Sequence, residues 1–297
     1  MSVTDITNID LTPEDKAALQ PVGDRLTRLV AITTSNLVHD AVDKPVPDSA
    51  IGKAKAAKLR DAYEQARQRL NSAEDHLRTI LTIITSATPV PQFALFTLVR
   101  AAAIPIVHAR YLLDPSISET DRLGRGLIAR LENQKQLRKV ERNEAESPDD
   151  EDAGDEGTTA DASLSPDDFF AERVEHFRKR AEAHGLSLVR DRNEKIIGFG
   201  ECWPSDTELF GFFMPGIGKL YFQYLSGYAH SLPWAQLPMH RAEPPDDEGD
   251  RLVPTDINVP VFAAVLSGAL TLYDETIGYF LAKAGFPAMV WTEAKKG

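Results

Sequence analysis

The sequence predicts a mainly α-helical protein, a multi-helix bundle with a small β-hairpin and a disordered acidic linker. Three observations support this class. Helix-capping residues precede long segments with apolar residues at helical spacing. The alternation typical of strands is confined to a short segment near residue 190, and an acidic run at 144–164 lacks the residues that build a core. The 297 residues are 42% hydrophobic and 26% charged, a composition that can support a hydrophobic core.

Two helices are predicted first. Thr12-Pro13-Glu14-Asp15 combines a capping residue, a proline suited to the first helical position and early acids, and apolar residues follow to Ile32. A second start at Asp48 leads into about forty residues without proline and with one glycine, which predicts a long helix. Within it, Leu59, Tyr63 and Leu70 share one face.

Pro89 and Pro91 end that helix, and the apolar segment 93–114 predicts a central, buried helix. The uncharged stretch 79–99 is long enough to span a bilayer. Its Pro-Val-Pro break instead favours two core helices joined by a turn, so no membrane span is expected. Ser118 then caps a basic amphipathic helix that runs to about residue 143.

Beyond the linker, Ser165 caps another helix that Gly185 closes. A hairpin around 192–194 follows as the one strand signal, then a capping box at 205–208 and a helix through residues 219–230. The expected organisation is therefore an N-terminal helical part at 1–143, a disordered linker at 144–164 and a C-terminal part at 165–297 that packs on the first. The acidic segment 242–250 is expected to be a solvent-exposed loop.

The net charge of −12 is unevenly distributed. Eleven acids and no lysine or arginine lie between Glu144 and Asp168, so the rest of the chain is nearly neutral. Basic segments flank this run, the first at 125–142, and the linker could fold back on them. The lone Cys202 cannot pair within the chain, and the acidic N-terminus lacks a secretory signal, so a cytoplasmic location is expected.

Most familiar catalytic motifs are missing, and no metal or cofactor is implied. The informative residues are histidines and arginines on apolar helices, among them His76 and His108. Arg100 lies inside the most apolar segment and requires a buried partner or a site. The expected partner is Glu74 or Asp75, although a functional role stays open.

His230 ends a helix with an aromatic face and precedes Pro233-Trp234. A core histidine bonded to a backbone carbonyl explains this position, and so does an acid/base group that titrates near neutrality.

A resemblance rests on LVRAAAIPIVHARYLLDPSISETDRLGRGL and YFQYLSGYAHSLPWAQL. These segments resemble actinobacterial helical proteins similar to the HEPN superfamily, over residues 70–142 and 215–240. HEPN proteins are helical bundles, commonly dimeric, and many are metal-independent ribonucleases of toxin and antiphage systems. Their motif is an Arg, often followed by Asn, with His four to six residues on. Here His230 matches the histidine, but Leu225 stands at the Arg position and Ser226 at the Asn position.

The resemblance implies a homodimer with an RNA-directed or antiphage/toxin-type defence role, in which the chain would be a degenerate metal-independent ribonuclease. Arg100 and His230 would be catalytic, the first binding phosphate and the second serving as general acid or base. The expected binding residues are Glu74, His76, Ser226, Tyr228 and Trp234. A second match to the motif, between Arg178 and His184, lies on a very polar helix and is interpreted as chance.

Two alternatives stay open. The first is a non-catalytic protein-interaction scaffold, in which the acidic linker masks the basic helix, because the motif Arg is absent. Its partner would be RNA or a protein. The second is a small-molecule binding bundle lined by Tyr221, Phe222 and Trp234.

Overall fold

The computed structural model describes residues 12–33, 37–86, 94–145, 165–236, 240–241 and 256–286. It is mainly helical, as predicted, and divides into two compact units. The first unit combines residues 1–115 with 204–297, and the second comprises residues 116–203. The elements therefore group differently from the expected parts 1–143 and 165–297. The basic helix belongs with the helix and strands that follow the linker, because it packs against them.

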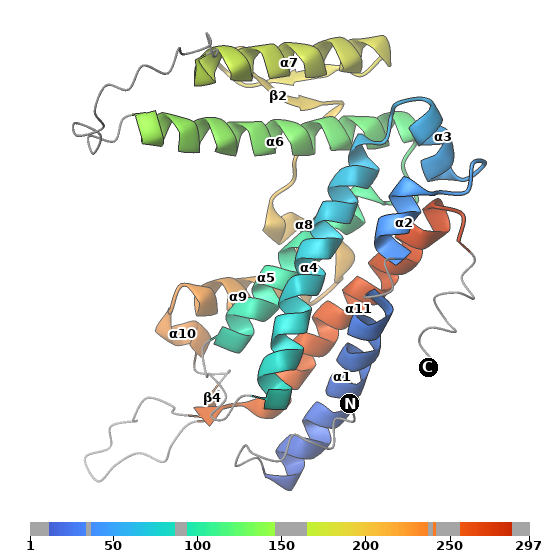
Figure 1. The fold of residues 1–297 in the computed structure, drawn as a ribbon. Helices are drawn as coiled ribbons and strands as arrows, with labels where there is room; N and C mark the ends of the chain where they lie inside the picture. The colour runs from blue at the N-terminus through green and yellow to red at the C-terminus, as the bar shows by residue number, and fades with distance from the viewer. Residues whose placement is uncertain are drawn as a thin grey trace, which may run out of the picture. The chain divides into compact units, whose positions relative to one another are not determined.

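The first unit is a bundle of helices (Figure 1). Its longer helices are α1 (Pro13–Thr33), α4 (Asp61–Ser86), α5 (Ala94–Leu112), α9 (Gly218–Ala229) and α11 (Val259–Lys283). Shorter helices are α2 (Leu37–Asp43), α3 (Ala50–Ala56), α8 (Asp206–Phe213) and α10 (Pro233–Gln236). Local capping starts several of them as predicted. The Thr12 hydroxyl accepts from the Asp15 amide, and Ser205 and Glu208 form a complete capping box at α8.

Helix α5 is the core helix of this unit and packs against α4, α8, α9 and α11. Its buried residues include Phe96, Val99 and Ile106. The Phe96 ring meets the ring of Tyr228 at 4.7 Å and that of Phe262 at 5.5 Å between centroids. The prediction of a central, buried helix is confirmed. Among the described residues, α5 is also the helix long and apolar enough to cross a membrane, which alone is weak support for a membrane protein because core helices pass the same test.

The prediction of one long helix from Asp48 is wrong in two respects. Ser49, not Asp48, caps α3, and four residues separate the end of α3 at Ala56 from the start of α4. Lys58 adopts the left-handed conformation, with φ of 59°. The Leu59 amide bonds to the Ala54 carbonyl at 2.8 Å and the Lys58 amide to the Lys55 carbonyl at 3.2 Å, which is the hydrogen-bond pattern that closes a helix around a left-handed residue.

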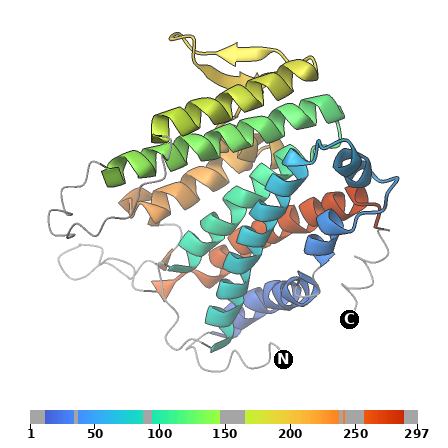
Figure 2. The ribbon, with the colours of Figure 1, turned by 45° about the horizontal axis from the view of Figure 1, so that its top comes forward.

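The second unit contains α6 (Glu119–Ala145), α7 (Pro166–Ala183) and strands β1 (Leu188–Arg190), β2 (Ile196–Phe199) and β3 (Glu201–Cys202). Figure 2 shows α6 and α7 side by side, and both contact β2. Ser118 caps α6 and Ser165 caps α7, as predicted. Gly185, at φ of +71°, follows the end of α7 in the conformation that only glycine adopts without strain.

The strands extend beyond the predicted hairpin. β3 adds a further antiparallel strand to β1 and β2, and β4 (His240–Arg241) pairs with β5 (Asp256–Ile257) in the first unit. These strands are two residues long, too short to show alternation in the sequence. The predicted linker at 144–164 overlaps the end of α6 at Ala145 and otherwise lies outside the described residues, as do the Pro89 and Pro91 break and the loop at 242–250.

Candidate functional site

Arg100 does not form the expected ion pair. Glu74 is instead paired with Arg78 one turn along α4, and Asp75 is exposed. The Arg100 guanidinium carbon lies 5.8 Å from the centre of the Phe222 ring, near the outer limit of a cation–π contact. Its Nε is buried and has no hydrogen-bond partner in the described part of the chain. Arg100 is thus accommodated by partial exposure, an aromatic ring and the charge of Asp206 rather than by an ion pair with Glu74 or Asp75.

His230 lies away from Arg100. It is the C-cap of α9, its backbone amide bonds to the Ser226 carbonyl, and its side chain is exposed. The contacts of α9 with α5 show that the two helices run antiparallel. Phe222 contacts Arg100, and Tyr228 contacts the earlier Phe96. His230 follows Phe222 by eight residues, or about 12 Å of helix, in the direction away from Arg100. The two residues therefore do not converge on one cleft.

The other expected binding residues are also dispersed. Tyr228 is only 2% exposed and packs in the core, where burial raises the pKa of its hydroxyl. Trp234 is 52% exposed and lies against Tyr224, with ring centres 5.6 Å apart. Ser226 is half-buried on α9, and His76 is half-buried on α4. These positions do not combine into one site.

The two lesser interpretations can be placed as well. Tyr221 is buried and donates its hydroxyl to the Val265 carbonyl at 2.8 Å, so this end of the expected small-molecule lining belongs to the core. Arg178 bonds to Glu175 and Glu182 on its own helix, while His184 is the exposed C-cap of α7.

The structure assembles a polar cluster on α5 that the sequence did not predict. Arg69 Nη1 lies 2.8 Å from His108 Nδ1, and His108 Nε2 lies 2.6 Å from Asp206 Oδ1. A guanidinium is only a donor, so Nδ1 must accept and the ring proton must reside on Nε2, which donates to Asp206. His108 is therefore neutral and ties α4, α5 and α8 together.

The electrostatics agree with this assignment. Burial lowers the pKa of His108, the hydrogen bond to Asp206 opposes that shift, and the charge of Arg69 adds to it. The hydrogen bond from His108 lowers the pKa of Asp206, and the charges of Arg100 and Arg69 act in the same direction. Both ring nitrogens of His108 are thus hydrogen-bonded, and the cluster links three helices of the first unit.

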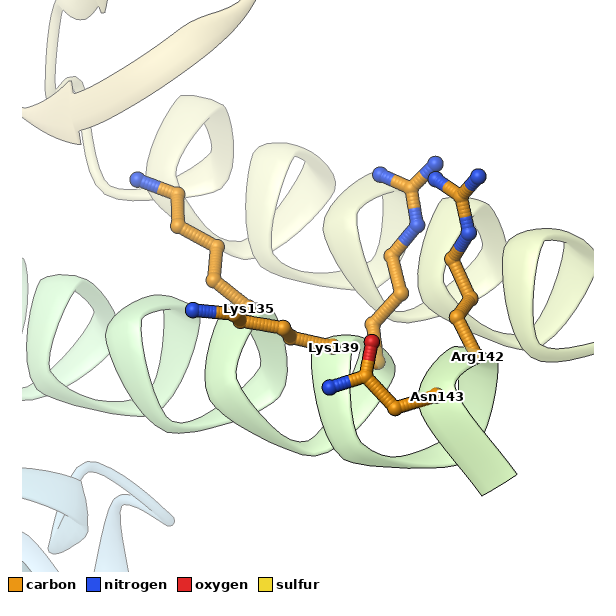
Figure 3. A pocket seen from close by; sticks show the side chains of 5 residues that line it. Lys135, Lys139, Arg142 and Asn143 are labelled. Carbon is orange, nitrogen blue, oxygen red and sulfur yellow. The ribbon is translucent and has the colours of Figure 1, made fainter. Parts of the chain in front are cut away.

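An accessible polar arrangement lies on α6 in the second unit. Its cations follow a spacing of i, i+3, i+4 and i+7 and surround a pocket of about 310 Å³. We call this surface the α6 basic face; it consists of Lys135, Arg138, Lys139, Arg142 and Asn143. Lys135 and Arg142 extend toward the side of α7, whereas Lys139 lies back along α6 toward Lys135 (Figure 3).

The ion pairs of this face are solvent-exposed. Arg138 Nε lies 2.7 Å from Asp167 Oδ1, with 34% and 55% of the side chains exposed. This hydrogen bond raises the pKa of Arg138 and lowers that of Asp167. Lys135 pairs with Glu132 at 2.6 Å, and Lys139 has no ion-pair partner among the described residues. Such exposed pairs contribute little to stability, so a competing anion can replace the carboxylate.

Comparison with known proteins found no match: no family model, no curated protein and no solved structure is significantly similar to the chain. Within the described residues, no group of three or more His, Cys, Asp or Glu side chains could hold a metal ion. The candidate site therefore depends on the geometry of this chain alone.

Sequence reasoning had noted the basic run that forms the α6 basic face without assigning it as a site. It missed the His108 cluster. His108 had been marked as a histidine on an apolar helix, which was a usable signal. Its partners could not be found in the same way, since Arg69 and Asp206 are 39 and 98 residues distant in sequence.

Proposed function

We propose that this protein is a non-catalytic helical scaffold that binds RNA through the α6 basic face. The observation that supports it is the row of cations around one pocket on a single exposed helix surface. Over residues 135–143 the helix carries four cations and one acid, Glu141. A row of this kind suits a polyanion, because phosphate contacts made by lysine, arginine and asparagine supply most of the affinity for a nucleic-acid backbone.

The charge distribution supports this assignment despite the net charge of −12. The described residues of the second unit contain 14 lysines and arginines against 13 acids, so this part of the chain does not repel phosphate. The α6 basic face concentrates the positive charge locally. Local potential, rather than the charge of the whole chain, steers an anionic ligand.

RNA as the ligand agrees with the HEPN resemblance. The non-catalytic role is supported by the separation of Arg100 from His230. A metal-independent ribonuclease of that kind needs its phosphate-binding cation and its acid/base group on the same phosphodiester. Arg100 contacts Phe222, while His230 lies two turns further along α9. The homodimer and the defence role implied by the resemblance remain predictions.

The proposal is tested by fluorescence anisotropy with a labelled 12-nucleotide RNA. The variant Lys139→Gln/Arg142→Gln removes two cations of the α6 basic face. If each cation contacts one phosphate, the negative slope of log K against log salt should become shallower by about 1.4. The affinity for RNA at moderate salt should fall by roughly tenfold. The matched control Lys53→Gln/Arg192→Gln removes two exposed cations elsewhere and should bind like the unmodified protein.

Equal binding by the two double variants would contradict the proposal. Polyglutamate serves as a competitor at equal charge concentration. Tighter binding of this peptide than of RNA would indicate an acidic protein partner and overturn the RNA assignment. Intact RNA is expected after incubation with a chelator. Cleavage to a cyclic 2′,3′-phosphate that is lost in Arg100→Ala and His230→Ala would overturn the non-catalytic role.

A further inference from the structure

A second, larger cavity adjoins the α6 basic face within the same unit. It has a volume of about 600 Å³ and lies between α6, α7 and the β1–β2 hairpin. This volume falls within the range of about 300 to 1,000 Å³ found for small-molecule sites. Lys135 and Arg138 line both this cavity and the pocket of the α6 basic face, so the two hollows are neighbours that share these side chains.

The lining of this cavity is largely apolar. Its apolar residues come from α7 and β2 and are Phe170, Ala171, Val174, Ile196 and Ile197. None of them is buried, although Phe177 on α7 and Phe199 on β2 are fully buried in the same unit. The unit therefore has a closed core and, separately, an open apolar hollow that an apolar ligand could fill.

The hollow also offers a planar stacking surface. The Arg138 guanidinium carbon lies 4.9 Å from the centre of the Phe170 ring, while its Nε bonds to Asp167. Unstacked bases of single-stranded nucleic acids bind on such aromatic rings and guanidinium planes. Polar groups that could bond to a base edge are also present, among them Asp191 and Lys195.

We propose that this cavity receives an unstacked nucleobase of single-stranded RNA while neighbouring phosphates lie on the α6 basic face. This inference rests on the proposed function and specifies its ligand. The ligand must carry a phosphate and a planar base in each of its repeating nucleotides. Single-stranded RNA has this composition. In a duplex the bases are paired and stacked and cannot enter the cavity.

The comparison of single-stranded with duplex RNA tests this directly. Backbone electrostatics alone favour the duplex, whose charge density gives the steeper salt dependence. The structure predicts the opposite order, with the 12-nucleotide single strand bound roughly tenfold more tightly than the 12-base-pair duplex of the same sequence, as expected for stacking of one base. Equal or tighter binding of the duplex would overturn the inference.

A cavity-filling variant locates the effect. Ala171→Leu/Val174→Met adds aliphatic volume, keeps the charge and uses good helix formers on a partly exposed face. It should abolish the preference for the single strand and leave duplex binding within twofold. Ala183→Leu, at the exposed end of α7 and outside the cavity lining, should keep the preference.

The outcomes separate the two proposals. If the filled variant is folded by circular dichroism and keeps the preference, the cavity is not the base site, although RNA binding by the α6 basic face still stands. If Lys139→Gln/Arg142→Gln has no effect on either RNA, the proposed function fails. Should the double filling variant unfold, Ala171→Leu alone provides the same comparison with a smaller expected loss of preference.

Discussion

The two arginines of α5 and the exposed Lys139 of the α6 basic face occupy different environments. On α5, Arg100 lies 5.8 Å from the ring of Phe222, and Arg110 lies 3.7 Å from that of Tyr279, both half-buried. On α6, Lys139 is exposed and has no ion-pair partner in the described ranges. The two arginines of α5 pack against aromatic rings, whereas Lys139 is open to solvent.

The difference shows which cations can serve binding. A half-buried guanidinium that stacks on a ring or bonds to a histidine has already lost part of its hydration. Removing the ring or the histidine therefore costs stability, because the charge is left without its partner. An exposed ammonium has a hydrated charge that is available to an incoming phosphate. An exposed basic run therefore fits the proposed phosphate ligand better than an arginine that packs on an apolar helix.

Asp206 and Asp167 provide the sharpest test of this comparison, because each bonds to one cationic or basic partner. Asp206→Ala should lower the free energy of unfolding by about 2 kcal/mol, since it removes the acceptor of His108 and the carboxylate near two arginines. Asp167→Ala removes an exposed partner of Arg138 and should cause no measurable change. Urea denaturation measures both. Similar losses in the two variants would contradict the distinction.

The His108 cluster should make the first unit sensitive to acid. Burial lowers the pKa of His108, so below its usual value of 6.5 the unfolded chain binds a proton that the folded chain does not accept. Stability should therefore be full above pH 6.5 and decrease as the pH falls toward the lowered value. The charged groups around the ring are Arg69, Asp206 and, through Asp206, Arg100.

Thermal unfolding between pH 7.5 and 5 measures this dependence. In His108→Gln the titrating group is absent, so the decrease in melting temperature on acidification should become smaller than in the unmodified protein. Asp167→Ala, which leaves the cluster intact, is the control. An unchanged acid sensitivity in His108→Gln would show that another group causes it.

The smallest expected effects concern the two arginines of α5. Arg110→Met should destabilise by about 1.5 kcal/mol, because Arg110 is close to Tyr279 and also faces Phe213. Arg100→Met should cost about 0.5 kcal/mol, since its ring contact is long. Chemical denaturation gives both values. A loss of several kcal/mol on Arg100→Met would instead indicate the buried carboxylate partner that the sequence had suggested.

The sequence by itself determined much of the local structure. Capping residues are read from short segments, so the starts at Thr12, Ser118, Ser165 and Ser205 were predicted correctly. The burial of α5 was predicted too, because a helix that is apolar nearly all round has no other stable environment in water. These features depend on neighbours within a few residues.

The tertiary structure decided the features that depend on distant residues. The grouping of α6 with α7 and β2 depends on which apolar faces meet, and the sequence instead predicted that α6 belongs with the helices before it.

The same limit applies to the sites. His108 and Asp206 were both visible in the sequence, but their hydrogen bond joins residues 98 positions apart and could not be predicted from it. Arg100 was expected to pair with Glu74, but in the structure Glu74 pairs with Arg78, which lies on α4 like Glu74 itself. Side-chain pairing is decided by the register and direction of packed helices, and these emerge only when all the apolar faces are buried together.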